Sequence, residues 1–431
     1  MLHYQSQKIN YVFLFPGLLL FFFILAFPTS LYNIKIALLV CVFFEILIWT
    51  LIRKTILIKR KWILFVLFVE IASSLFIALG VFLNAPGAIN SATVFIAWPI
   101  VYLVLFSMLF FDQVLFSLFK VFILSLLFIS IYSFTYIGNE LGVIPKFLYI
   151  DFDLGQSIGF YNGFMEYSLY SLNSLIFLIP FCISGVLVWN QRFYNTIRVS
   201  KNVVLIITIL GLISALLSGR RGLWLSIVIG TLISFILYLM IMKHNKSFLK
   251  KVSKYAVIIL LLGLVIIPIF NMYIDININS LWDKFNLDMG YERESQLESL
   301  INGWMNRPIF GNGLGSVASV IRSEEMPWAY ELQYVDLLFK TGIIGVLIYT
   351  LSGFYIINKL VKIARRDDES AMVVIPILTG LSAFLIANAT NPYLLKFDYV
   401  WLLLLPIGII NHYSLTQNEL YHNGNGGEID V

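Results

Sequence analysis

The sequence predicts an all-α polytopic membrane protein with about 12 transmembrane helices, from its composition, its apolar runs and the placement of its basic residues. Of 431 residues, 60% are hydrophobic and only 12% are charged, whereas soluble domains carry about 25% charged residues. An apolar run of about 20 residues crosses a bilayer as a helix, and this chain has many such runs. The short alternating segments of a transmembrane β-barrel are absent from the sequence.

The predicted spans follow the apolar runs, with ends set to within about four residues. They lie near 11–27, 36–52, 62–82, 91–111, 114–136, 167–189, 203–218, 222–242, 255–270, 335–357, 371–387 and 398–413. The first run has no small-residue cleavage site behind it, so we expect a retained span and not a removed signal peptide. The polar segment 414–431 is expected to be a disordered cytoplasmic tail, which leaves 1–413 as a single transmembrane domain.

Clusters of Lys and Arg occur only in connections that follow even-numbered spans. They are Arg53, Lys54, Lys59, Arg60 and Lys61; Arg192, Arg198 and Lys201; Lys243, Lys246, Lys250, Lys251 and Lys254; and Lys359, Lys362, Arg365 and Arg366. The positive-inside rule places these connections and both termini in the cytoplasm. Membrane orientation therefore accounts for the net charge of +5 without a nucleic-acid partner. The two cysteines, Cys41 and Cys182, lie inside apolar runs, which excludes a disulfide framework or a cysteine metal site.

The long connection at residues 271–333 faces outward in this topology, on the periplasmic side. A connection longer than about 15 residues is usually functional or disordered. This one is neither low in complexity nor strongly polar. We therefore expect a folded functional segment that the membrane spans hold in position.

Within this loop, residues 292–305 have the apolar spacing of an amphipathic helix that ends before Pro308. Its apolar face consists of Leu297, Leu300, Ile301, Trp304 and Met305. Such a helix also occurs as a surface helix that rests on the bilayer or on neighbouring spans. The glycines that follow, Gly311, Gly313 and Gly315, predict a tight, flexible turn.

Arg220 and Arg221 break two apolar runs on the outer face. Arginine at membrane depth is costly and marks a functional site by default, and its guanidinium matches phosphate oxygens in a bidentate way. The alternative is an arginine pair that extends to lipid headgroups from a short turn. Outside the spans this face has few other basic residues, namely Lys35, Lys146, Lys284, Arg293, Arg307, Arg322 and Lys396.

The large loop carries more acidic than basic residues, so an anionic ligand there needs individually placed arginines. Arg293 and Arg307 are the candidates, although each is also explained as an ordinary charge on the surface or at the end of the helix. Glu331 would act as a general base if partial burial raised its pKa; the alternative is an interfacial acid at a helix N-terminus.

The four histidines are His3, His244, His412 and His422. The predicted topology places all of them in the cytoplasm or at that interface, so we expect no external histidine base and no histidine metal site. Three further charges, Glu45, Glu70 and Lys120, lie inside spans. They suggest either an internal ion pair or the proton relay of a transporter.

Two segments resemble elements of the bacterial O-antigen polymerase and O-antigen ligase family. Residues 217–225 (Leu-Ser-Gly-Arg-Arg-Gly-Leu-Trp-Leu) resemble its Ser-x-Arg-Gly stretch, and residues 307–315 (Arg-Pro-Ile-Phe-Gly-Asn-Gly-Leu-Gly) resemble its Pro-x-x-Gly-x-Gly-x-Gly element. Arg293 matches the arginine that opens the family's amphipathic helix, and residues 159–168 resemble another family element loosely.

The ligases of this family carry a His-Asn pair before a Gly-x-x-Gly element. Alignment on Gly342 and Gly345 places that pair at Glu331 and Leu332. The replacement of histidine by glutamate favours a polymerase over a ligase.

The resemblance implies a metal-independent, inverting membrane glycosyltransferase without a cofactor, in the bacterial cytoplasmic (inner) membrane. It would polymerise repeat units of O-antigen or capsule by moving a growing glycan from undecaprenyl diphosphate onto an incoming lipid-linked repeat unit. Its implied partners are the undecaprenyl-diphosphate-linked oligosaccharide, the lipid bilayer and a chain-length regulator protein. The alternatives are an O-antigen ligase, a flippase or other transporter of lipid-linked oligosaccharide, and a glycan-binding scaffold.

We hypothesise that the catalytic residues are Arg220, Arg221, Arg293 and Glu331. The arginines would bind the diphosphate and stabilise its developing charge, and Glu331 would accept the proton of the attacking hydroxyl. The remaining candidates for substrate binding are Arg307, Trp304, Tyr334, Gly311 and Gly313. The aromatic side chains would stack on sugars, although an interfacial aromatic belt explains them equally well.

Overall fold

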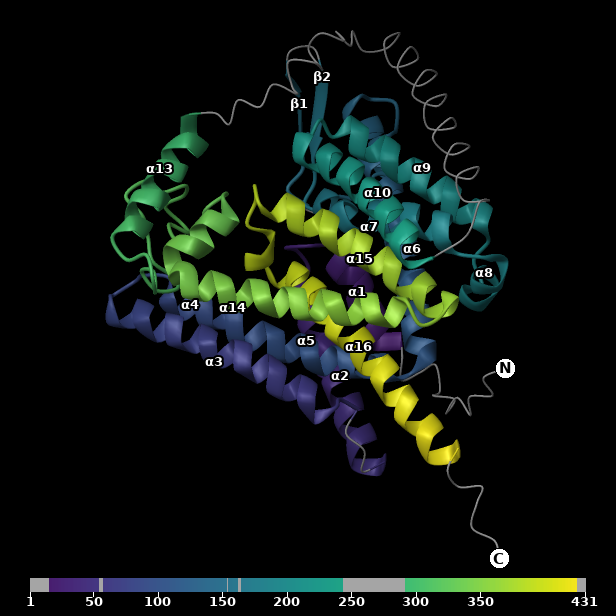
Figure 1. Ribbon diagram of the computed structural model, residues 1–431. Coiled ribbons are helices and arrows are strands. Elements are labelled where there is room, and N and C mark those ends of the chain that lie inside the picture. Colours follow the sequence, from purple (N-terminus) through teal and green to yellow (C-terminus); the bar gives the residue numbers. More distant parts are fainter. Residues whose placement is uncertain (1–14, 54–56, 153, 162–163, 243–290, 425–431) are drawn as a thin grey trace, which may run out of the picture.

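The computed structural model describes residues 15–53, 57–152, 154–161, 164–242 and 291–424 (Figure 1). In this part of the chain, seven helices are long and apolar enough to cross a membrane, or eight if the bent pair Gln191–Ile197 and Lys201–Leu217 forms one span. These helices confirm the expectation of an all-α membrane-embedded protein. The total of 12 spans stays a prediction, and the span expected at 255–270 lies outside the described residues.

The long helices of the first half begin and end close to the predicted spans, and shorter elements lie between them. They are α1 (Phe15–Ala26), α2 (Tyr32–Arg53), α3 (Arg60–Phe82), α4 (Ala88–Ala92), a π-helix (Thr93–Ala97), α5 (Trp98–Ser107), a 3-10 turn (Met108–Phe110), α6 (Asp112–Glu140), a 3-10 turn (Lys146–Leu148), β1 (Ser157–Tyr161), β2 (Phe164–Ser168), α7 (Leu172–Val188), α8 (Gln191–Ile197) and α9 (Lys201–Leu217).

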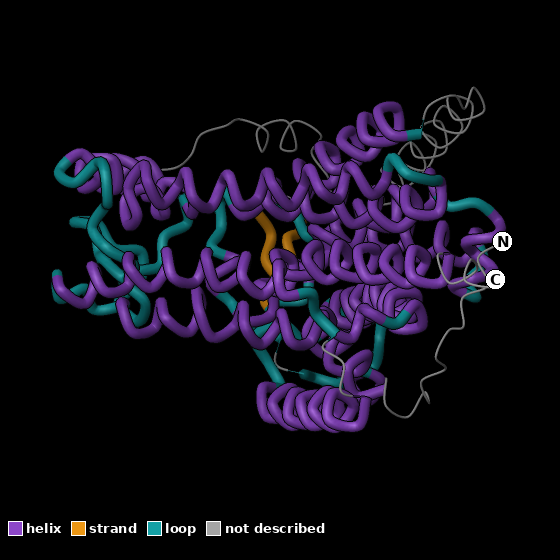
Figure 2. The backbone as a smooth tube through the Cα atoms, turned by 60° about the horizontal axis from the view of Figure 1, so that its bottom comes forward, coloured by secondary structure: helices purple, strands orange, loops and turns teal. Residues whose placement is uncertain are grey.

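The second half comprises α10 (Arg221–Ile241), α13 (Tyr291–Met305), α14 (Gln333–Ala364), α15 (Asp368–Asn388), a 3-10 turn (Tyr393–Leu395) and α16 (Phe397–Gly424). Helix α16 therefore continues into the segment expected to be a disordered tail, and 425–431 lie outside the described residues. Figure 2 shows the long helices side by side, with connections gathered at both ends of the bundle.

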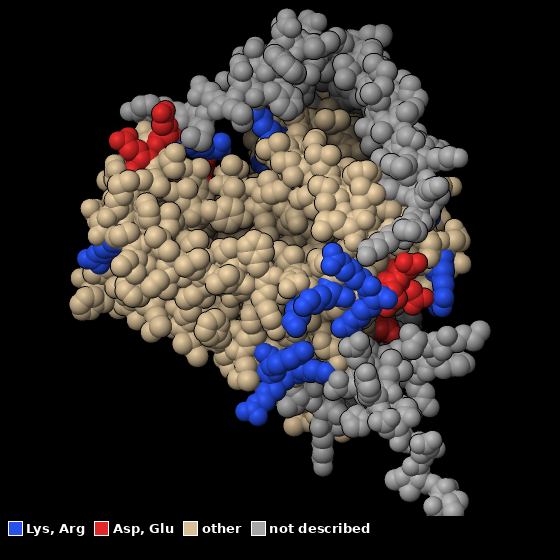
Figure 3. All heavy atoms as spheres, viewed as in Figure 1, with Lys and Arg blue, Asp and Glu red and all other residues tan. Residues whose placement is uncertain are grey.

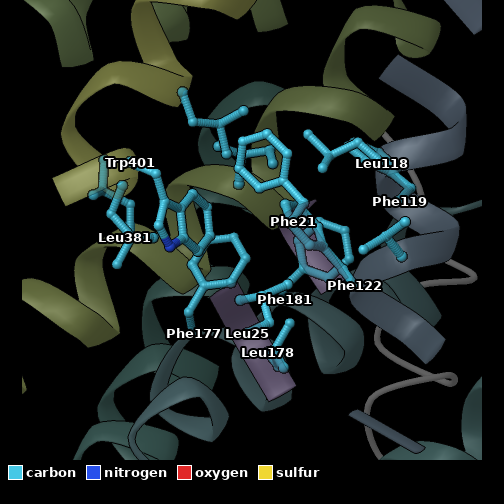
Figure 4. Close-up of a cluster of buried hydrophobic side chains, with 14 of the residues drawn as sticks. Phe21, Leu25, Leu118, Phe119, Phe122, Phe177, Leu178, Phe181, Leu381 and Trp401 are labelled. Carbon is cyan, nitrogen blue, oxygen red and sulfur yellow. The ribbon is translucent and has the colours of Figure 1, made fainter. Parts of the chain in front are cut away.

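Aromatic rings fill the core where α1, α6, α7 and α16 meet (Figure 4). The ring of Phe177 lies 5.1 Å from that of Trp401, and Phe122 lies 5.1 Å from Phe181. Lipid tails are as apolar as the helix surfaces, so the hydrophobic effect does not drive helix association within the bilayer. Close van der Waals packing stabilises the association instead. Offset and edge-to-face aromatic pairs add about 0.5–1.5 kcal/mol each beyond area burial.

A buried ion pair joins the start of α2 to the start of α16. Lys35 Nζ lies 2.5 Å from Asp398 Oδ1 and donates to the carbonyl of Phe27 at 2.7 Å, and the amide of Thr29 donates to Asp398 Oδ2. Both charged side chains are almost fully buried, so removal of either would leave an uncompensated charge. Lys35 therefore has a structural partner and is not a free cation of the outer face.

The expected ion pair among Glu45, Glu70 and Lys120 is absent from the ion pairs of the described residues. Glu45 Oε2 and Glu70 Oε1 are buried without a hydrogen-bond partner there. The buried lysine pairs lie elsewhere, at Lys35–Asp398 and at Lys340–Asp336 within α14.

Residues expected to lie in a plain loop form an antiparallel hairpin of β1 and β2, paired from Ser157–Ser168 to Tyr161–Phe164. The sequence does carry a signal for it, because Asn-Gly between two β-prone segments favours a hairpin, and Asn162-Gly163 stands between these strands. Strands of five residues do not stand out among apolar runs of membrane length.

Gly311, Gly313 and Gly315, which we call the glycine clamp, join three helices through backbone contacts. Gly313 N donates to Lys340 O at 2.8 Å, Leu314 N donates to Phe76 O at 2.9 Å, and Gly87 N donates to Gly315 O at 3.1 Å. A Cβ on Gly313 would lie 2.3 Å from the nearest backbone atom of Gly80. The turn is tight, as expected. Its glycines allow close backbone contact with α3, α4 and α14, whereas the sequence predicted that they make the turn flexible.

Helix α14 breaks at Gly342, whose φ of 62° and ψ of −168° are not helical. A break in a membrane helix leaves amides that need other acceptors. Here Ile343 N donates to Pro308 O at 3.0 Å and Ile344 N donates to Ile309 O at 3.2 Å. The loop thus supplies the acceptors that the broken helix lacks.

Replacement of Gly313 by Ala tests this contact. Its φ of 85° and the backbone of Gly80 leave no room for a side chain, so Gly313→Ala should destabilise the protein by more than about 1 kcal/mol. Gly353→Ala in α14 is the matched control, because no atom lies within 4 Å of its Cβ position. Equal thermal-unfolding midpoints of the two variants in detergent would contradict the contact.

Candidate functional site

Helix α13 forms where the sequence predicts the amphipathic helix, and it packs on the chain itself. Leu300 is fully buried with Tyr330, Leu332 and Phe339, and Leu297 and Trp304 pack against this cluster while partly exposed. The sequence left open whether the apolar face rests on the bilayer or on neighbouring spans. The structure shows this face in contact with the neighbouring loop and with α14. Met305, counted with that face, is 62% exposed.

Glu331 bridges two arginines that come from different parts of the loop. Its Oε2 lies 2.5 Å from Arg293 Nε, on the first turns of α13, and its Oε1 lies 3.2 Å from Arg322 Nε. Its backbone amide donates to Gln296 Oε1 at 3.4 Å. Hydrogen bonds between ionised partners are about twice as strong as neutral ones, so this carboxylate positions both guanidinium groups.

Arg220 is held by neutral acceptors. Its Nη1 donates to Asn173 Oδ1 at 2.8 Å and its Nη2 donates to Ser168 Oγ at 2.5 Å, which joins the start of α10 to α7 and to β2. Because neither partner is charged, the positive charge of Arg220 is oriented without being neutralised by them. Arg221 follows as the first residue of α10 and is exposed.

The side chain of Glu166 lies against Gly219, directly before this arginine pair. A Cβ built on Gly219 would lie 2.6 Å from Glu166 Cγ, and the φ of 67° at Gly219 favours glycine in any case. A carboxylate on β2 is thus placed beside Gly219-Arg220-Arg221.

The connection between α15 and α16 lies within electrostatic range of Arg220 and of the arginines that Glu331 contacts. Burial raises the pKa of Tyr393, and the charges of Arg220, Glu331 and Arg293 act on the same phenol. Burial lowers the pKa of Lys396, Arg322 and Arg220 lower it further, and Asp398 opposes them. Figure 3 shows Lys and Arg side chains on both sides of the hollow between α13 and the hairpin.

We define Arg220, Arg293, Arg322 and Lys396 as the cationic site. Arg220 directly precedes α10, Arg293 lies on α13, Arg322 lies in the loop before α14, and Lys396 directly precedes α16. Glu331 forms ion pairs with two of these residues, Arg293 and Arg322. An arrangement with more cations than paired carboxylates suits an anion with several oxygens, such as a phosphate or diphosphate.

Other predicted site residues lie elsewhere or have contacts within the chain. Trp304 Nε1 donates to Pro308 O at 3.1 Å, and the hydroxyl of Tyr334 donates to Leu385 O at 2.6 Å. Arg307 lies just beyond the opposite end of α13 from Arg293, roughly 20 Å away at 1.5 Å per residue. The contacts of Gly311 and Gly313 are packing contacts, and a binding role for either stays a prediction.

The structure adds Arg322, Lys396, Ser168, Asn173 and Tyr393 to the candidate residues. Arg322 and Lys396 are among the few basic residues of the predicted outer face, and that scarcity is the sequence signal that could have singled them out. No sequence motif marks Ser168 or Asn173, because their role depends on a contact with Arg220 across about 50 positions.

No family model and no curated protein matches the sequence. Among the described residues, no group of three or more His, Cys, Asp or Glu side chains is placed to hold a metal ion.

Substitution of Glu331 tests whether it positions the two arginines. Glu331→Gln removes the charge that both guanidinium groups contact, so the free energy of unfolding should fall by about 1–2 kcal/mol. Glu369→Gln is the matched control, because its ion pair with Arg192 is largely exposed and should contribute less than about 0.5 kcal/mol. Denaturant titration in detergent measures both, and equal losses would contradict the role of Glu331.

Proposed function

We propose that the protein is a polysaccharide polymerase of a bacterial cytoplasmic membrane. It moves a growing glycan from undecaprenyl diphosphate onto an incoming lipid-linked repeat unit of O-antigen or capsule, on the outer face of the membrane. The observation that supports this proposal is the cationic site, where four cations from distant parts of the chain converge. Two of its members carry the family resemblance: Arg220, in the segment 217–225, and Arg293, on α13.

The position of the cationic site relative to α14 supports its placement on the outer face of the membrane. Glu331 lies just before the first residue of α14, whereas Arg365 and Arg366 follow its last residue. The positive-inside rule assigns the basic end to the cytoplasm. The cationic site then lies at the outer end, where the lipid-linked substrate would present its diphosphate.

The chemistry required is a single displacement. The acceptor hydroxyl forms a bond to the anomeric carbon of the growing glycan as the bond to the diphosphate oxygen breaks. The diphosphate leaves with the electron pair, so negative charge develops on its oxygens. Arg220, Arg293 and Arg322 would stabilise that charge in the transition state, and Lys396 adds a fourth positive charge.

The proton of the acceptor hydroxyl passes to a carboxylate. Glu331 is the acceptor expected from the sequence, and its two arginine contacts give it a positioning role as well. Glu166, beside Gly219, is the second carboxylate near the site. The ligase alternative needs an outer-face histidine, whereas His412 lies 3.2 Å from Asp112 at the start of α6, next to the predicted cytoplasmic side.

The test compares surface-glycan ladders of the source bacterium with the gene deleted, restored, or restored as Arg220→Ala. We expect deletion to leave single repeat units. Arg220→Ala should approach the same result, because removal of one preorganised donor lowers such rates about 100- to 1,000-fold. Arg220→Lys should retain short polymers, since it keeps the charge without the two-donor geometry.

Arg192→Ala is the control variant for this test, because Arg192 is an exposed arginine on α8, away from the cationic site. It should give a normal ladder at an equal protein level. An unchanged ladder after deletion would contradict a polymerase for that glycan, and loss of every repeat unit would favour a ligase or a flippase.

A further inference from the structure

A cavity of about 540 Å³ lies on α13, away from the cationic site. Its walls are the α3–α4 turn at 83–86, the second half of α13 with Arg307, and residues of the segment 312–319, which begins directly after Gly311. Phe339 of α14 contributes an apolar patch to its lining. The glycine clamp shapes this cavity, because it fixes the segment 312–319 against α3 and α4.

Amides and hydroxyls form most of the polar lining, and Arg307 is its charged residue. Some of these groups are already fixed: Asn312 Nδ2 donates to the carbonyls of Gly303 and Phe339, and Ser299 Oγ lies 2.8 Å from Ser319 Oγ. By contrast, the structure gives the side chains of Asn302 and Asn306 no hydrogen bond to the described part of the chain.

The lining matches a ligand rich in hydroxyl groups. A hydroxyl is both donor and acceptor, and a carboxamide offers two donors and an acceptor. A site with amides, hydroxyls and one guanidinium suits neutral sugar rings better than a diphosphate, which would need several cations.

We propose that this cavity is a second glycan-binding site, which holds neutral sugar rings of the polymer while the cationic site holds the diphosphate. The proposal rests on the proposed function. Asn302 lies nine positions after Arg293 on the same helix, which places the two sites roughly 14 Å apart at 1.5 Å per residue. Binding here would retain the glycan between transfers, so it would set polymer length and not the ability to form a linkage.

The direct test is protection of a cysteine placed in the cavity. Asn302→Cys is made in a chain that also carries Cys41→Ala, because Cys41 is exposed whereas Cys182 is buried. The purified full chain in detergent is alkylated with a maleimide, with and without oligosaccharide fragments of the source bacterium's surface polysaccharide. We expect the fragments to slow alkylation at least about threefold.

Glu298→Cys in the same background is the matched control, because Glu298 is exposed on α13 and does not line the cavity. The fragments should leave its alkylation rate unchanged. Equal rates with and without fragments at Asn302→Cys would overturn the proposal. Protection by inorganic pyrophosphate but not by the fragments would also overturn it, because the cavity would then be an anion site.

A second test uses the polymer itself. The double variant Asn302→Ala/Asn306→Ala should make polymers of at least twofold shorter average length while linkages still form. Suppose that the length distribution is unchanged while the ladder of Arg220→Ala is reduced to single repeat units. That result would refute glycan binding in this cavity without contradicting the proposed polymerase function. An unchanged ladder after gene deletion would instead remove the proposed function.

Discussion

The backbone contact between the glycine clamp and the broken helix α14 is the constraint on which the rest of the structure depends. The amides of Ile343 and Ile344 lose their helical acceptors at Gly342, and the carbonyls of Pro308 and Ile309 replace them. Unpaired amides at membrane depth are expensive, so the loop and the helix need one another. Their contact fixes where α13 ends and where the chain enters α14.

The cationic site follows from that placement. Arg293 lies on α13 and Glu331 just before α14, so the clamp indirectly sets both partners of one ion pair. Arg220 reaches the same region from the other side, where the hairpin and α7 hold it by neutral oxygens. The two oxygens that hold Arg220 among the described residues carry no charge, and this property distinguishes it from the buried Lys35, which is paired with Asp398.

Local pattern in the sequence predicts much of this arrangement. The apolar runs locate the described helices, the spacing of Leu297, Leu300 and Trp304 locates α13, and the scarcity of outer-face cations points to Arg220 and Arg293. Pairings across long sequence separations leave no such pattern. Lys35 and Asp398 are 363 positions apart, and the contact of Ser168 with Arg220 depends on a hairpin too short to register as a span.

The most direct measurement of the central claim is a reaction with purified components. The full chain would be reconstituted in vesicles with undecaprenyl-diphosphate-linked repeat units from the source bacterium, in the presence of a metal chelator. The account predicts lipid-linked glycans of two or more repeat units, with one undecaprenyl diphosphate released for each new linkage. Movement of intact repeat units across the bilayer without any new linkage would contradict it and would indicate a transporter.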